Sequence, residues 1–386
     1  MPAMRVSTFD GNLSHARASP LARAACAVYA LLLLYSGLAP WSGWRDLGLN
    51  PFAYLAAPIP AHVTNFDLAF NVLAYLPFGA LLVLALHPAA SAIRAVLIAA
   101  LIGFVLAAFI EAAQSYLPTR ISSNLDLLTN TGGALLGALL TAPLASSLID
   151  RGRLAQWRLR WFERDASVLL LVVALWPAAQ IYPESMLFGN GDIRDAMDPS
   201  DSALGDVLAT VDVAVFGAAN VFGVAEFVLA EAFVVAAAIL AVGLAFASTM
   251  QPRAPRVKLL LTLLVAAGLA RTLANAVQFG PERALAWLTP GAYGGIALGV
   301  LSLLTASAGP RIWSARLALL ATLALILAVN LVPDNPFYID AIGTWRQGAL
   351  LNFNLLAHWL SLLWPYALAL VLLFAGVQRR SAAASL

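Results

Sequence analysis

The sequence IRAVLIAALIGFVLAAFIEAAQSY, residues 93–116, decides the class of fold. Between Arg94 and Glu111 it holds an unbroken run of residues without a charged or strongly polar side chain. The hydrocarbon core of a bilayer is about 30 Å thick, and a helix needs roughly 20 apolar residues to cross it. The stretch therefore predicts a membrane-spanning helix that carries one acidic residue near its end.

The composition of the whole chain leads to the same class. Of its 386 residues, 61% are hydrophobic and 11% are charged, whereas ordinary soluble domains carry about 25% charged residues. High hydrophobicity also excludes a disordered chain. Twenty-two Lys and Arg against 20 Asp and Glu leave a net charge of +2, so we expect no nucleic-acid partner. The single Cys26 excludes a disulfide framework and a thiolate metal cluster.

Ten apolar runs of this kind lie between charged or proline-rich breaks. They predict an all-α, polytopic helical membrane protein with about ten transmembrane helices. The predicted spans are residues 24–41, 66–87, 93–116, 125–147, 166–182, 223–247, 257–279, 285–308, 313–332 and 352–377.

The basic residues alternate between the two sides of the membrane along these spans. Sixteen of the 22 lie in the two tails and in the connections after the second, fourth, sixth and eighth spans. The side richer in Lys and Arg faces the cytoplasm. We therefore expect a multi-pass protein of the bacterial inner (plasma) membrane with both termini in the cytoplasm.

Two segments of the chain resemble each other, residues 110–137 and residues 274–299. Gln114 aligns with Gln278, and the basic turns that precede the two segments also correspond. Both segments contain a GxxxG pattern, which lets helices approach closely and predicts a structural role in packing. The aligned glycines are Gly133 and Gly137 in the first segment and Gly295 and Gly299 in the second.

A third fragment, residues 352–365, resembles residues 65–77. Two copies of a four-helix unit plus two helices therefore account for all ten spans. Each copy has an even number of spans, so the repeats are parallel. The predicted organisation is a four-span unit at 1–150, a basic cytoplasmic linker at 151–165, a degenerate second four-span copy at 166–308, and a two-span half copy with a cytoplasmic tail at 309–386.

Polar residues recur in pairs at the outer ends of three spans in the first copy. The members of a pair are three or four residues apart, so they share one helix face. Arg120 lies in the loop between the third and fourth spans. Ionisable groups in a bilayer are costly and are candidate functional residues by default. We expect one ligand-binding cluster made of Asp67, Asn71, Glu111, Gln114, Arg120, Asp126 and Asn130.

The residues alone leave four interpretations of this cluster open. It is a buried network that joins helices, a recognition site for a polar or lipid-linked head group, a catalytic site with Glu111 or Asp126 as general base, or a divalent-metal site. Interhelical hydrogen bonds average only about 0.6 kcal/mol, so carboxylates are a costly way to join helices. The polar residues stop about halfway through the membrane, which argues against a transport path. We expect no metal and no cofactor.

The second copy lacks the carboxylates of the first. Asn275 replaces Glu111, and new charges lie within its spans instead. A lone arginine inside a span is expensive, so we expect Arg271 to pair with Glu231 or Glu226 as a structural ion pair.

Several residues of the first copy form a motif set: an acid and an Asn ahead of Pro-x-Gly, then Glu-x-x-Gln, then an Arg followed by an Asp and Asn-x-x-Gly. They are Asp67, Asn71, Pro77, Gly79, Glu111, Gln114, Arg120, Asp126, Asn130 and Gly133. Because they contain this motif set, residues 66–137 resemble the VanZ-like family of bacterial membrane proteins. With the first span the resemblance covers about 125 residues, and the remaining chain matches only as degraded copies.

The resemblance implies a small helical bundle associated with the cell envelope. The named member of the family is linked to low-level resistance to the glycopeptide teicoplanin. We therefore expect a non-enzymatic envelope protein that recognises a polar or lipid-linked glycan head group at the outer leaflet, with glycopeptide resistance or envelope polysaccharide as its context. Its partners would be membrane lipids and a lipid-linked glycan precursor. The alternative is a membrane-embedded hydrolase or transferase with Glu111 as general base.

Overall fold

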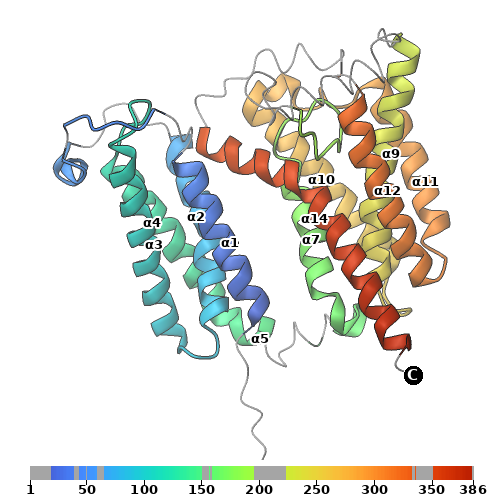
Figure 1. The fold of residues 1–386 in the computed structure, drawn as a ribbon, viewed down its shortest axis with the longest axis horizontal. Helices are drawn as coiled ribbons and strands as arrows, with labels where there is room; N and C mark the ends of the chain where they lie inside the picture. The colour runs from blue at the N-terminus through green and yellow to red at the C-terminus, as the bar shows by residue number, and fades with distance from the viewer. Residues whose placement is uncertain are drawn as a thin grey trace, which may run out of the picture. The chain divides into compact units, whose positions relative to one another are not determined.

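The computed structural model describes residues 19–38, 43–48, 50–58, 65–149, 156, 159–194, 223–332, 335 and 351–384. Within these residues the chain is helical, and its β-structure is limited to one isolated bridge between Phe162 and Met250 (Figure 1). The all-α prediction is confirmed. The α-helices are α1 (Pro20–Gly37), α2 (Asn65–Leu86), α3 (Ala92–Gln114), α4 (Asn124–Thr141), α5 (Ala145–Ile149), α7 (Ser167–Ala179), α9 (Val224–Thr249), α10 (Arg256–Phe279), α11 (Pro290–Ala306), α12 (Arg311–Leu331) and α14 (Leu351–Ala384), with 3₁₀ turns η1 (Ala53–Ala56), η2 (Ala142–Leu144), η3 (Arg164–Ala166) and η4 (Pro281–Arg283).

Every predicted span overlaps one of these helices. Seven described helices are long and apolar enough to cross a membrane by themselves, and three apolar helices, in α1, α7 and α11, are shorter. Ten spans are consistent with this pattern if the chain next to each shorter helix completes the crossing.

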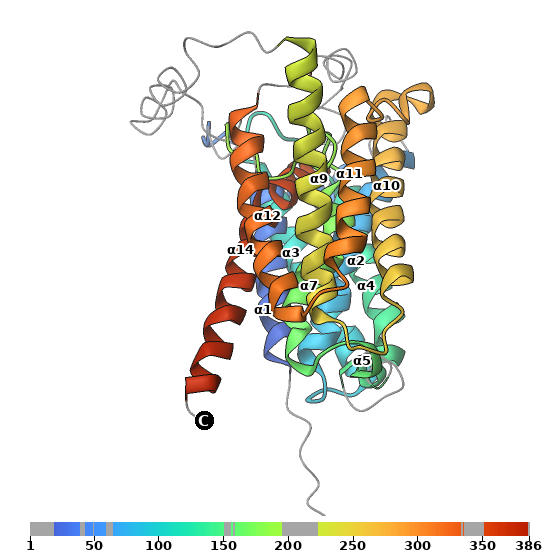
Figure 2. The same ribbon diagram turned by 90° about the vertical axis from the view of Figure 1, so that its right-hand side faces the viewer.

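The chain divides into two compact units, residues 1–156 and residues 157–386. In the first unit α2 packs mainly against α4, α3 also packs against α4, and α1 packs against α2. In the second unit the helices of residues 166–308 pack against those of residues 309–386. Figure 2 shows α9 between α11 and α12, and α14 packs against α7 and α12.

Glycines bring the backbones of α2 and α4 into contact in the first unit. A Cβ atom at Gly133 would lie 2.3 Å from the carbonyl oxygen of Val72, and one at Gly137 would lie 1.9 Å from that of Leu76. From the α2 side, Gly79 makes a similarly close approach to α4. Small residues at a helix interface allow such a short separation, which fixes the register of the two helices that carry the polar residues.

Helix α7 of the second unit is too short to cross a bilayer. With 13 residues, α7 is about 20 Å long, and the chain continues as an irregular, largely buried segment over residues 180–194. Irregular backbone at membrane depth is tolerated only where its polar groups are satisfied inside the protein. The fifth predicted span, residues 166–182, is therefore helical only to Ala179.

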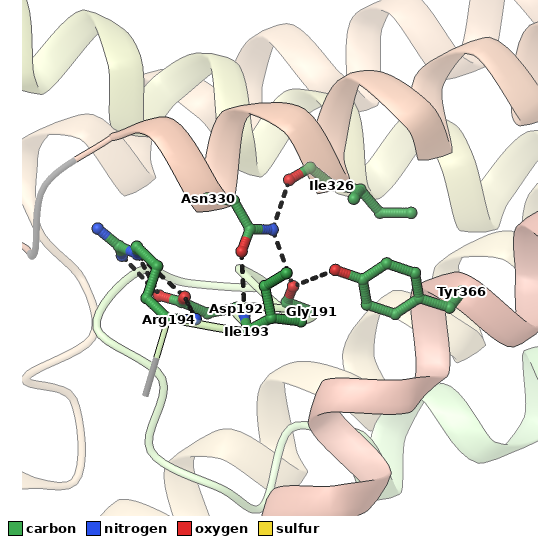
Figure 3. A network of polar contacts seen from close by, with 7 residues as sticks. All are labelled: Gly191, Asp192, Ile193, Arg194, Ile326, Asn330 and Tyr366. Atoms are coloured by element: carbon green, nitrogen blue, oxygen red, sulfur yellow. Dashed lines mark hydrogen bonds and ion pairs between the residues drawn. The ribbon is translucent and has the colours of Figure 1, made fainter. Parts of the chain in front are cut away.

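Asn330 and Tyr366 supply hydrogen bonds to this buried segment (Figure 3). The Nδ2 of Asn330 and the Oη of Tyr366 donate to the carbonyl oxygen of Gly191, at 3.0 and 2.9 Å. The Oδ1 of Asn330 accepts from the backbone N–H of Ile193 at 2.9 Å. Because these residues come from α12 and α14, two helices of the half copy hold the irregular backbone.

Candidate functional site

The turn between α3 and α4 places Glu111 inside the first unit. Its side chain is 2% exposed, and its Oε2 accepts a hydrogen bond from the backbone N–H of Ser123 at 2.7 Å. The hydroxyl of Ser122 donates to the carbonyl oxygen of Glu111, also at 2.7 Å. Both bonds tie the end of α3 to the start of α4, so the carboxylate faces the interior of the unit and not the lipid.

Ser123 is the N-cap of α4. Its hydroxyl oxygen accepts from the backbone N–H groups of Leu125 and Asp126, at 3.2 and 3.3 Å. The first turn of a helix leaves N–H groups without helical partners and carries a partial positive charge. The N-terminus of α4 therefore stabilises two carboxylates, Glu111 from α3 and Asp126 within its own first turn.

Asp126 joins α4 to α2. Its Oδ1 accepts from the Nδ2 of Asn71 at 2.8 Å, and both side chains are half-buried. Glu111 lies within electrostatic range of both Asp126 and Arg120. Burial lowers the pKa of the Arg120 guanidinium, and the nearby Glu111 carboxylate acts in the opposite direction. We call Asn71, Glu111, Arg120, Ser123 and Asp126 the Glu111 cluster.

Two further polar atoms lie one helical turn from this cluster. Asn130 follows Asp126 by one turn of α4, and Tyr75 follows Asn71 by one turn of α2. The Oδ1 of Asn130 and the Oη of Tyr75 are buried without a hydrogen-bond partner within the part of the chain that the structure describes. Tyr75 also lies within electrostatic range of Glu111.

The other two predicted site residues are Gln114 and Asp67. The Nε2 of Gln114 donates to the carbonyl oxygen of Gly37 at 2.8 Å, so this side chain ties α3 to the end of α1. The side chain of Asp67 lies outside the described residues, although its backbone belongs to α2.

Tyr54 belongs to this site but was not predicted from the sequence. It comes from η1, in the connection between α1 and α2, and it is buried. Its hydroxyl donates to the carbonyl oxygen of Ala108, in α3, at 3.3 Å. Burial, followed by the proximity of Glu111, raises the pKa of the Tyr54 hydroxyl. A tyrosine in a loop carries no periodic signal that would assign it to a site formed by helices.

The second unit has a buried acid at a related place. Gly295 of α11 packs on the backbone of Ala232, as Gly133 packs on Val72. This register places Glu231 where the first unit has its Asn71. Glu231 is 0% exposed. Its Oε1 accepts from the hydroxyl of Thr289, the N-cap of α11, and from the Nδ2 of Asn335.

The predicted ion pair between Arg271 and Glu231 or Glu226 is wrong. Arg271 is 1% exposed, and its guanidinium donates to the carbonyl oxygens of Tyr182 and Glu184. Glu231 is bound by Thr289 and Asn335 instead. The physical reason lies in the buried segment 180–194, whose carbonyl groups need donors. Backbone groups of this kind do not appear in a pattern of charged residues.

Other buried polar residues of the second unit hold the same segment. The Nε2 of Gln278 donates to the carbonyl oxygen of Ile181 at 2.9 Å. Asn190 donates to the hydroxyl of Ser361 at 2.6 Å, and Ser361 donates to Glu184. These polar side chains therefore support the fold of the second unit.

The Glu111 cluster is suited to hydrogen bonding with polar groups. Its two described carboxylates accept from a backbone amide and from a side-chain amide. Within the described ranges, no group of three or more His, Cys, Asp and Glu side chains is placed to hold a metal ion.

Comparison with known proteins agrees with the motifs of the first unit. Residues 24–146 match the model of the VanZ/LLP1 family, so the N-terminal part of the chain is VanZ-like. These residues contain the whole Glu111 cluster. No curated protein and no solved structure matches the chain.

Proposed function

Taking as premise a multi-pass membrane protein whose N-terminal part is VanZ-like, we propose that the Glu111 cluster binds the polar head group of a membrane lipid at the outer leaflet. A lipid-linked glycan precursor is the ligand class that we favour. In this proposal the protein is a non-enzymatic component of the bacterial cell envelope. Its helices hold and orient the site.

The observation that carries this proposal is that two buried polar atoms beside the cluster, the Oδ1 of Asn130 and the Oη of Tyr75, have no partner among the described residues. Leaving a buried donor or acceptor unsatisfied costs about 1–3 kcal/mol, and native structures contain few such groups. A hydroxyl group of a bound ligand can both donate and accept, so it would satisfy either atom.

The rest of the cluster fits the same chemistry. Asp126 and Asn71 are half-buried, so their hydrogen-bonding groups are partly accessible. Carboxylate and amide oxygens accept hydrogen bonds from sugar hydroxyls, and the amide N–H groups donate to them. The guanidinium of Arg120 is the group best suited to a phosphate linkage. A glycan joined to a lipid through phosphate offers both kinds of group.

Native mass spectrometry of the full chain in nanodiscs tests the proposal. The probes are a bilayer of phospholipid alone and the same bilayer with a polyprenyl-phosphate-linked sugar. We expect the protein to retain the linked sugar, and Glu111→Gln should lower its retention about tenfold, which corresponds to about 1.4 kcal/mol of binding free energy. The substitution keeps the size of the side chain and removes its charge.

The matched control is Asn275→Ala, at the position of the second copy that aligns with Glu111. This variant should retain the linked sugar like the unchanged protein. Equal retention by Glu111→Gln and by the unchanged protein would contradict the proposal. Conversion of the probe to a species of different mass would instead support the hydrolase or transferase alternative.

The proposal also requires a topology in which the Glu111 cluster faces away from the cytoplasm. Reporter fusions at two connections of the second unit test the alternation of basic residues that underlies this orientation. A fusion after Glu282, in η4, should report the outer side, and one after Arg253, between α9 and α10, should report the cytoplasm. The reverse result would place the cluster at the inner leaflet.

A further inference from the structure

The connection between α1 and α2 packs against the end of the first unit that carries the Glu111 cluster. Its described residues, 43–48 and 50–58, are called here the cover segment. The backbone N–H of Arg45 donates to the carbonyl oxygen of Tyr116 at 3.0 Å. The Nδ2 of Asn124 donates to the carbonyl oxygen of Ala57 at 2.6 Å. In Figure 1 the segment lies beside the upper end of α3.

The inner side of the cover segment reaches the site. Tyr54 is 5% exposed, and its hydroxyl is bonded to α3 at Ala108. The proximity of Glu111 contributes to the raised pKa of this hydroxyl. The segment therefore contributes one buried aromatic side chain near the carboxylate of the cluster.

The outer side of the cover segment is apolar and exposed. Phe52 and Leu55 flank Tyr54 and are 58% and 52% exposed, and Trp44 and Leu47 are also exposed. In the neighbouring α3–α4 loop, Ile121 is 89% exposed. Soluble surfaces rarely gather large apolar side chains in this way. Aromatic side chains at the ends of membrane helices are typical of the bilayer interface.

We propose that the cover segment rests in the membrane interface, with Phe52 and Leu55 among the lipids, so that the Glu111 cluster takes a lipid-anchored ligand from the bilayer. The lipid surface is the occupant that fits, because the exposed large residues of the segment are apolar, the segment is bonded to the residues that follow α3, and α3 itself exposes Ile102, Val105 and Phe109. The inference about the ligand rests on the proposed function. The inference about the segment does not.

Spin labels test the position of the segment without any ligand. In a Cys26→Ala background, labels at Phe52→Cys and Leu55→Cys in nanodiscs should be more accessible to oxygen than to a water-soluble nickel chelate. A label at Asp46→Cys, on a charged and exposed residue of the same segment, is the matched control and should show the opposite preference. Preference for the nickel chelate at both Phe52 and Leu55 would overturn the interfacial position.

A comparison of two ligands tests the route. One probe is the polyprenyl-phosphate-linked sugar in nanodiscs, and the other is the soluble sugar phosphate with the same head group. We expect at least about tenfold stronger binding of the lipid-linked form. The double variant Phe52→Ser and Leu55→Ser should weaken binding of the lipid-linked form and leave thermal stability unchanged.

The outcomes separate the two proposals. Equal affinity for the soluble and the lipid-linked probe would overturn the lipid route and leave the proposed head-group function standing. Binding of neither probe would overturn the proposed function and the ligand route together, while the spin-label result would still decide the position of the segment.

Discussion

The two units of the chain share a helical frame and differ in where they place their acidic residues. In both, a GxxxG helix packs on the second helix of its unit. In both, an aligned glutamine of the third helix donates to a carbonyl group at or just beyond the end of the first helix, Gln114 to Gly37 and Gln278 to Ile181. The aligned glutamines therefore make similar hydrogen bonds in the two units.

The N-cap of the fourth helix receives a buried glutamate in each unit, but from a different helix. Ser123 binds Glu111 of the third helix, through its backbone N–H. Thr289 binds Glu231 of the second helix, through its hydroxyl. The positive end of the fourth helix is thus the common feature, and the helix that supplies the acid can change.

The polar groups around these acids are used differently. The first unit keeps buried polar atoms without partners in the described chain, at Asn130 and Tyr75. In the second unit Arg271 and Gln278 donate to the buried segment 180–194, while the Oε1 of Gln278 and the Oε2 of Glu231 are also buried without a partner in the described chain. The difference between the units is therefore the irregular backbone, which only the second unit holds with donors from Arg271 and Gln278 among the described residues.

The largest effect is expected for Arg271→Ala. The substitution removes two hydrogen bonds from a charged donor, each worth about 1.5–3 kcal/mol, so the free energy of unfolding should fall by about 3–6 kcal/mol. Unfolding in detergent, followed by circular dichroism, measures it. Lys258→Ala, at an exposed position of the same helix, is the control and should change little.

A double variant sharpens this result. Because Glu231 is bound by Thr289 and Asn335, adding Glu231→Ala to Arg271→Ala should give no recovery of stability. Recovery would show that the two residues form an ion pair after all.

The next effect is expected at the glycine contacts. Gly137→Ala forces a Cβ atom against the carbonyl oxygen of Leu76, at 1.9 Å without rearrangement, and should cost about 1–3 kcal/mol. In the second unit, Gly299→Ala meets its nearest atoms at 3.0 Å and should cost less. Gly132→Ala, with no neighbouring atom within 4 Å, is the control. Thermal unfolding ranks the three, and an equal loss at Gly132 would contradict the packing argument.

A smaller and equal effect is expected for the two aligned glutamines. Gln114→Ala and Gln278→Ala each remove one hydrogen bond to a backbone carbonyl group, so each should lower stability by about 1 kcal/mol. Chemical unfolding of the two single variants compares them. A loss at Gln114 with none at Gln278 would limit the correspondence of the units to their sequences.

The smallest effect on stability is expected for Asp126→Asn. An asparagine still offers a side-chain oxygen to the Nδ2 of Asn71, so unfolding should change by less than about 0.5 kcal/mol. Retention of the lipid-linked sugar should nevertheless fall, since the charge of the cluster is reduced. A loss of stability without a loss of retention would assign Asp126 a structural role only.

Much of the fold could be predicted because a membrane span requires an apolar run of a defined length. The same criterion predicted too long a helix at α7, because the chain continues as irregular backbone after Ala179. The side chains that satisfy this backbone, such as Asn330 and Tyr366, lie more than a hundred residues further along the chain. A local pattern cannot identify partners at that distance.

The candidate site could be predicted in part. Glu111, Asp126 and Asn71 each belong to a pair of polar residues at the outer end of a predicted span. The members of each pair share one helix face, so the three residues were expected to lie close together. Ser123 three residues before Asp126 is the spacing of a helix N-cap, and this signal could have located the partner of Glu111. Tyr54 gave no such signal, since its place depends on how a loop folds back onto α3.

The buried segment 180–194 has a consequence for how the protein is made. Its polar backbone is satisfied by Arg271, Asn330 and Tyr366, which are synthesised later. Until α10, α12 and α14 have entered the membrane, α7 therefore carries a segment that lipid cannot accommodate. The second unit must then assemble after synthesis of its last helix, whereas the described hydrogen bonds of the Glu111 cluster can form once α4 has been made.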